Sequence, residues 1–218
     1  MDREKTISRL ARLLWVIVFI LTAIGIAMVI RRILTMAHII PSVNPAGGPP
    51  FDTSFGKHPV ITLLHILPGA LFMLLGPLQF MRSIRARHIR FHRRSGYVYI
   101  VCAYIVGFSA VSMPFVMLPI GGINEAAGSM LFGIFFLIAL SKAWRHIVRK
   151  ELALHREWMI RAYAIGLAVA TIRPIMVLFF AFSGLEPQVF FGTAFWIGFT
   201  IHLITAEVWI NYTRGRSF

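Results

Sequence analysis

The chain is divided into six long apolar runs, separated by short clusters of basic residues. A hydrocarbon core about 30 Å thick takes about 20 helical residues to cross. A helix also satisfies its own backbone hydrogen bonds where lipid offers no partner. We therefore expect an all-α fold, a polytopic membrane bundle of six transmembrane helices that forms one transmembrane domain over residues 1–218. The six runs are residues 10–30, 59–81, 96–118, 126–144, 158–182 and 189–210.

The amino-acid composition is also typical of an integral membrane protein. Hydrophobic residues make up 58% of the sequence and charged residues only 14%, against about 25% charged in an ordinary soluble domain. The net charge of +14 would suggest nucleic-acid binding in a soluble protein. Since no soluble surface is left to form a groove, we expect no nucleic-acid partner. The single cysteine, Cys102, excludes an internal disulfide.

The basic clusters indicate which side of the membrane each end of the bundle faces. Eighteen of the 22 lysines and arginines lie before or at the start of the first run, after the second, around the connection of the fourth and fifth, and after the sixth. Positive charge marks the cytoplasmic face, so the pattern predicts that both termini are cytoplasmic. The first run ends in Arg31 and Arg32 rather than a small-residue cleavage site, which favours a retained helix over a signal peptide.

The segments on the other side are short, with one exception. Residues 33–57 contain several prolines and glycines and are predicted to form an irregular outer loop. Tight turns are predicted at residues 119–122 and 183–187 for the same reason.

Polar side chains within the apolar runs are candidates for function, because a charged group at the membrane centre costs about 2.5–3.5 kcal/mol or more. His65 and Arg173 lie at similar depth in the outer half, and His202 lies nearer the inner side. Each has two interpretations. The histidines could ligate haem or metal or relay protons, or they could form hydrogen bonds between helices. Arg173 could hold an anionic group, or pair with carbonyls freed near Pro174.

Two histidines at the inner interface, His92 and His155, form a second group of candidates. Two histidines at equal depth on different helices are the usual axial ligands of a membrane b-type haem. The pair also suits a quinone or headgroup site, or simply a basic loop held against lipid phosphates. His92-Arg93 and His155-Arg156 occupy equivalent places before the third and fifth runs, which suggests a weak internal repeat.

Two stretches resemble a known family. The first is His65 followed by residues 76–80, Gly-Pro-Leu-Gln-Phe, and residues 92–99, His-Arg-Arg-Ser-Gly-Tyr-Val-Tyr. The second is residues 155–163, His-Arg-Glu-Trp-Met-Ile-Arg-Ala-Tyr, followed by Arg173. Together they resemble the bacterial predicted membrane proteins grouped as domain of unknown function 2306, with a departure at Tyr97, where a basic residue is expected. The resemblance implies a multi-helix protein of the bacterial inner membrane, and it adds Trp158 to the positions of interest.

Three functions remain open. The first is a redox protein that binds b haem, quinone or both; the second is a small transporter or channel; the third is a non-catalytic subunit of a membrane complex. For the first, His92 and His155 are the predicted haem-iron ligands. The predicted cofactor-binding residues are His65, Gln79, His92, Arg93, His155, Arg161, Arg173 and His202.

Overall fold

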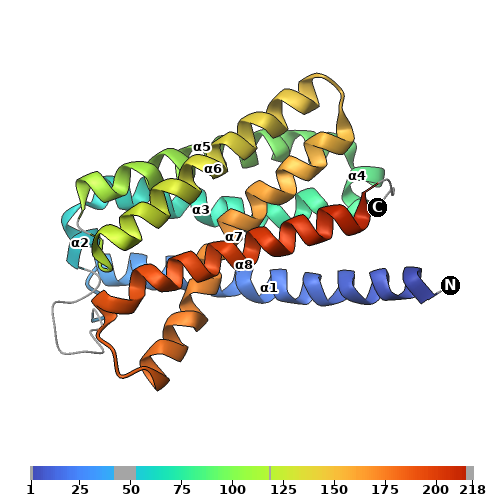
Figure 1. Ribbon diagram of the computed structural model, residues 1–218. Coiled ribbons are helices and arrows are strands. Elements are labelled where there is room, and N and C mark those ends of the chain that lie inside the picture. The colour runs from blue at the N-terminus through green and yellow to red at the C-terminus, as the bar shows by residue number, and fades with distance from the viewer. Residues whose placement is uncertain (1, 42–52, 118, 215–218) are drawn as a thin grey trace.

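The computed structural model describes residues 2–41, 53–117 and 119–214, and all regular structure in these ranges is helical. Six of its helices are long and apolar enough to cross a membrane (Figure 1), which confirms the expected all-α membrane bundle. The helices in chain order are α1 (Asp2–Met36), α2 (Thr53–Lys57), α3 (Pro59–Phe80), α4 (Arg82–Arg87), α5 (Ile89–Val116), α6 (Gly122–Val148), α7 (Leu152–Phe182) and α8 (Pro187–Thr213).

Several helices extend further than their apolar runs. Helix α5 begins at Ile89 rather than at 96, α7 begins at Leu152 rather than at 158, and α1 covers residues on both sides of the predicted 10–30. Hydropathy detects only the part of a helix inside the hydrocarbon core. The helical backbone continues into the polar layer, where basic side chains are solvated. The helices predicted from the apolar runs were therefore too short.

Two short helices lie in segments that were expected to be loops. Helix α4 carries the basic connection between α3 and α5. Helix α2 lies at the end of the predicted outer loop 33–57, and α1 occupies its start. Residues 42–52 of that loop lie outside the described residues. In its described part, the loop contains more helix than the sequence predicted. A helix as short as α2 has no long apolar run by which it could be recognised.

The predicted tight turns are confirmed by backbone geometry. Gly122 and Gly184 adopt positive φ angles of 59° and 63°, which glycine reaches without steric cost. The connection of α6 to α7 is equally tight. The Glu151 N–H donates to the His146 carbonyl at 2.9 Å, the Lys150 N–H donates to the Ile147 carbonyl at 3.0 Å, and Lys150 has a φ of 62°. This is a Schellman motif.

The long helices pack as a closed ring with one helix outside it. In order around the ring, α1 packs on α3, α3 on α5, α5 on α6, α6 on α7, and α7 on α1; α8 packs against α6 and α7. Aromatic side chains fill the centre of this ring. The Phe72 ring lies 4.7 Å from that of Tyr99, 5.6 Å from Phe136 and 5.8 Å from Tyr163, between ring centroids. The core therefore joins α3, α5, α6 and α7 through one cluster.

One end of the bundle gathers most of the basic residues. Figure 1 shows the start of α1, helix α4, the connection of α6 to α7 and the end of α8 at this end. We call it the basic end. An even number of spans places the start of α1 and the end of α8 on the same side of the membrane. That this side is the cytoplasm stays a prediction from the positive-inside rule.

Candidate functional site

Three helices turn polar faces toward the interior at the basic end. On α5 the residues are His92, Ser95 and Tyr99, spaced i, i+3 and i+7, so they share one face. On α7 they are His155 and Tyr163, two turns apart. Helix α3 adds a glutamine, described below. The interior between these faces is the candidate site.

Gln79 bridges α3 and α5 within this interior. Its Nε2 donates to the Ser95 hydroxyl at 2.8 Å, and that hydroxyl donates to the Phe91 carbonyl at 2.8 Å. Both side chains are buried. Gly96 allows the approach, since a Cβ there would lie 3.2 Å from the Gln79 Oε1. The predicted residue Gln79 thus belongs to the site, and Ser95 was missed because it looked like an ordinary helix residue.

His92 and His155 occupy equivalent places, each being the fourth residue of its helix. They are close enough for the charge of one ring to act on the other. The His155 Nδ1 contacts the Ala143 carbonyl at 2.9 Å. Because a carbonyl only accepts, Nδ1 carries the proton, and in the neutral ring Nε2 has the free lone pair. The His92 Nδ1 is buried and has no hydrogen-bond partner among the described residues. The sequence-predicted pair is therefore brought together.

Cations surround this histidine pair. Arg85 and Arg93 both act electrostatically on His92, and Arg93 itself is solvent-exposed. Arg156 follows His155 and donates to the Thr213 hydroxyl of α8 at 3.1 Å. Burial, with a smaller effect of the neighbouring Arg82, lowers the pKa of Arg85 below its usual value. The histidine pair thus lies in a field of positive potential.

Arg161 belongs to an ion-pair network between α7 and α8. Its Nε and Nη2 donate to the two carboxylate oxygens of Glu207 at 2.5 and 2.9 Å. Its Nη1 lies 3.9 Å from the Glu157 carboxylate, which also accepts two hydrogen bonds from Arg214. The hydrogen bonds with Glu157 raise the pKa of Arg214. Arg161, predicted to bind a cofactor, is thus held by two carboxylates.

Trp158 lies between two of the cations at this end. The Lys142 Nζ is 4.3 Å from the centroid of its ring, and the Arg161 guanidinium carbon is 4.5 Å away. Both distances are typical of cation–π contact. The tryptophan singled out by the family resemblance therefore positions the charges of α6 and α7.

The other two predicted histidines, His65 and His202, each form a hydrogen bond with a neighbouring helix. The His65 Nδ1 forms a 2.9 Å hydrogen bond with the Ser109 hydroxyl of α5. The His202 Nε2 forms a 2.7 Å hydrogen bond with the Thr171 hydroxyl of α7. Neither joins the His92–His155 pair, and the hydrogen bonds match the inter-helix interpretation of these residues.

Arg173 has a carboxylate within electrostatic range. Glu125, near the start of α6, interacts with the Arg173 charge and accepts a hydrogen bond of 2.8 Å from the Gly121 N–H. The sequence offered no sign of this pairing, because Glu125 lies at the edge of an apolar run and 48 positions away. Its partner is decided by how α6 and α7 pack.

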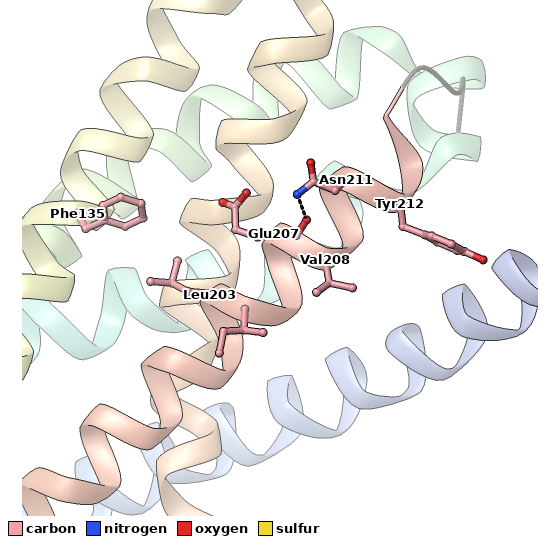
Figure 2. A pocket seen from close by; sticks show the side chains of 7 residues that line it. Phe135, Leu203, Glu207, Val208, Asn211 and Tyr212 are labelled. Carbon is pink, nitrogen blue, oxygen red and sulfur yellow. Dashed lines mark hydrogen bonds between the residues drawn. The ribbon is translucent and has the colours of Figure 1, made fainter.

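A groove about 750 Å³ in volume opens on the surface between α6 and α8. Figure 2 shows the Glu207 and Asn211 side chains on one face of α8, with Phe135 of α6 across the groove. The groove is mainly apolar, and Glu207 brings to it a carboxylate whose side chain is 45% exposed. The lining residues are Phe135, Leu203, Ile204, Glu207, Val208, Asn211 and Tyr212.

Among the described residues, no three or more His, Cys, Asp or Glu side chains are grouped as a metal-ion site requires. This result concerns metal ions that the protein binds directly. It does not test a haem site, because a haem iron needs only two protein ligands.

Comparison with protein families matches residues 62–210 to the family described as "Predicted membrane protein (DUF2306)", which confirms the resemblance found in the sequence. No curated protein and no solved structure matches the chain. The matched region begins after α1 and contains the histidine pair, Gln79 and both tyrosines of the interior.

Proposed function

The chain belongs to the DUF2306 family of predicted membrane proteins, and we propose that it is a membrane redox protein that holds a b-type haem between His92 and His155. The observation that carries the proposal is the position of the two imidazoles and the hydrogen bonds that they make. They come from two helices at one level, they interact electrostatically, and neither ring is fully committed to the protein.

The hydrogen bond of His155 suits a haem ligand. A ligating histidine usually donates its other N–H to a carbonyl or carboxylate, which fixes the tautomer and the ring orientation. His155 has this arrangement, with Nδ1 on the Ala143 carbonyl and Nε2 left for iron. The His92 Nδ1 is buried and has no hydrogen-bond partner among the described residues, so no hydrogen bond at this atom competes with ligation of the same group.

The surrounding charge also suits haem. Arg85, Arg93 and Arg156 lie at the same end of the bundle, and propionates are anionic groups that guanidinium binds well. When bound, haem would supply one-electron transfer. The chain would supply the axial ligands and the cations for the propionates.

The test is an optical spectrum of the detergent-purified protein expressed with haem supply, oxidised and then reduced with dithionite. We expect a reduced α-band typical of b haem, lost in both His92→Ala and His155→Ala. His88→Ala, one turn before His92 on the exposed surface, is the matched control and should retain the band. Elution volume on a sizing column checks folding. A featureless wild-type spectrum, or a band unchanged in both variants, would overturn the proposal.

A quinone is the second candidate, favoured by the groove between α6 and α8. A lipid-soluble ring with a polar rim fits an apolar groove that is open to the membrane and holds one carboxylate. Val208→Trp would fill the groove, and Val189→Trp, at a similarly exposed place on α8, is the control. We expect quinone binding, followed by quenching of protein fluorescence, to be lost only in the first variant.

The transporter hypothesis is based on Arg173, Pro174, Glu207 and the possible internal repeat. The interaction of Arg173 with Glu125 gives the arginine charge a partner inside the protein. An accessory role in a membrane complex stays a hypothesis, to be tested by co-purification.

A further inference from the structure

Four buried side-chain atoms have no hydrogen-bond partner in the described part of the chain, and all four come from helices of the ring. They are the Thr22 Oγ1, the His92 Nδ1 and the hydroxyl oxygens of Tyr99 and Tyr163. A buried polar atom without a partner is costly, and most native structures avoid it. Four such atoms in one bundle indicate a missing partner.

Three of the four are hydroxyls that converge at the centre of the helix ring. Tyr99 is 0% exposed, Tyr163 is 7% exposed and Thr22 is 8% exposed. The two phenols interact electrostatically. The Thr22 hydroxyl lies beside that of Tyr163, yet neither meets the geometry of a hydrogen bond. The cluster thus joins α1, α5 and α7.

The fourth atom lies toward the basic end. Tyr99 follows His92 by seven residues, so it lies about 10 Å deeper along α5. Ser95 and Gln79, which are hydrogen-bonded to each other, lie between them. Beyond Tyr99 the next buried α5 residues are Cys102 and Ala103, and the next buried polar side chain on α5 that forms a hydrogen bond is Ser109, which binds His65. An apolar stretch therefore separates the hydroxyls from the His65–Ser109 pair.

We propose that the polar side chains between the basic end and the hydroxyls line a hydrated recess, open at that end, whose floor is ordered water bound by Thr22, Tyr99 and Tyr163. A buried water needs two to four polar partners, and the three hydroxyls supply them. The hydroxyls are surrounded by close aromatic packing, with the Phe72 ring 4.7 Å from that of Tyr99, which favours water over a larger ligand.

Such a recess would carry protons to the centre of the bundle from one side only. The inference does not depend on haem, because it concerns hydroxyls about two helical turns away from the histidine pair. It also gives a role to α1, which lies before the matched family region and contributes Thr22.

The first test is X-ray hydroxyl-radical footprinting of the intact protein, in which a buried side chain is oxidised quickly only beside bound water. Phe190, 1% exposed and packed against Phe179 and Phe180, is the dry control. After correction for intrinsic reactivity, we expect Tyr99 and Tyr163 to be oxidised several times faster than Phe190. Equal, slow rates would overturn the proposal.

The second test uses the sign of a stability change. Tyr99→Phe removes one hydroxyl with little change of shape. If that hydroxyl binds water, the melting temperature falls by about 2–4 °C. If it has no partner, removing it relieves a cost and the melting temperature rises, which would overturn the proposal. A fall confined to Tyr163→Phe and Thr22→Val would indicate a direct bond between those two residues, and would also overturn it.

Discussion

Gly76 lets the Tyr163 ring lie against the backbone of α3. A Cβ built at Gly76 would lie 2.1 Å from the Tyr163 Cε2 and 2.8 Å from its Cδ2 and Cζ. The ring has little freedom to retreat, because it packs at 5.3 Å from the Phe80 ring and 5.8 Å from the Phe72 ring, between centroids. Gly76→Ala should therefore disturb both the core and the hydroxyl cluster.

The size of the effect follows from two opposed terms. Replacing glycine by alanine inside a helix favours folding by about 0.5–1 kcal/mol. Adding a methyl group to a filled core costs about 1–3 kcal/mol. The net effect of Gly76→Ala is a loss of about 1–2 kcal/mol. For a chain of this size, this corresponds to a melting temperature lower by about 2–8 °C.

Gly69 provides a matched control in the same helix. A Cβ there would meet only the Val106 Cγ2, at 3.8 Å, which is ordinary van der Waals contact. Gly69→Ala should keep the helix-propensity gain and raise the melting temperature slightly. Both variants are compared with wild type by thermal unfolding in one detergent, using intrinsic fluorescence.

A second variant separates ring contact from other effects. Tyr163→Leu removes the ring atoms that a Cβ at Gly76 would meet. Adding Gly76→Ala to Tyr163→Leu should therefore cost less than adding it to wild type, a non-additivity expected of residues in contact. If Gly76→Ala is as stable as Gly69→Ala, the ring contact does not limit this position and the reasoning is refuted.

Three further predictions concern charge and topology. Arg161→Met should destabilise the protein by about 2 kcal/mol, which is less than the 3–5 kcal/mol of a fully buried pair because Glu207 is partly exposed. Glu207→Gln should cost less. A double-mutant cycle of the two variants measures the coupling energy, and a coupling energy of zero would contradict the prediction. The His146 hydrogen bond lowers the pKa of Glu151, so Glu151 adds stability above its unfolded pKa and loses it as pH falls through the lower folded pKa. Glu151→Gln should melt below wild type at pH 7, with the difference in melting temperature disappearing once the pH has fallen below the folded pKa of Glu151; a constant difference would contradict this. A green fluorescent protein fused after the last residue should fluoresce if the basic end is cytoplasmic, and a dark fusion of a well-expressed chain would reverse the predicted orientation.

Much of the fold could be read from the sequence, because lipid imposes one strong rule. A run of about 20 apolar residues has few alternatives to a spanning helix, and the six runs became six helices. The helix ends were less accurate, since hydropathy falls to zero where the helix enters the polar layer. Helix α5 already begins at Ile89 within the basic segment.

The sequence predicted residues of the candidate site only where their position along one helix was enough to give their depth in the membrane. His92 and His155 were expected at one level because each stands at the start of a helix on the same side. The partners across helices could not be predicted in this way. The pairing of Glu207 with Arg161 depends on the rotation of α8 against α7. The electrostatic interaction of Glu125 with Arg173 depends in the same manner on how α6 packs against α7.

The sequence by itself determined the number of spans, their order and the gathering of positive charge at alternate connections. These properties depend on transfer between lipid and water, which each segment undergoes independently of the others. The tertiary structure decided which faces of the helices meet. Whether Tyr99 faces Phe72 or lipid depends on a rotation that every helix of the ring must satisfy at once. Only that joint packing brought Thr22, Tyr99 and Tyr163 from three helices close enough to interact.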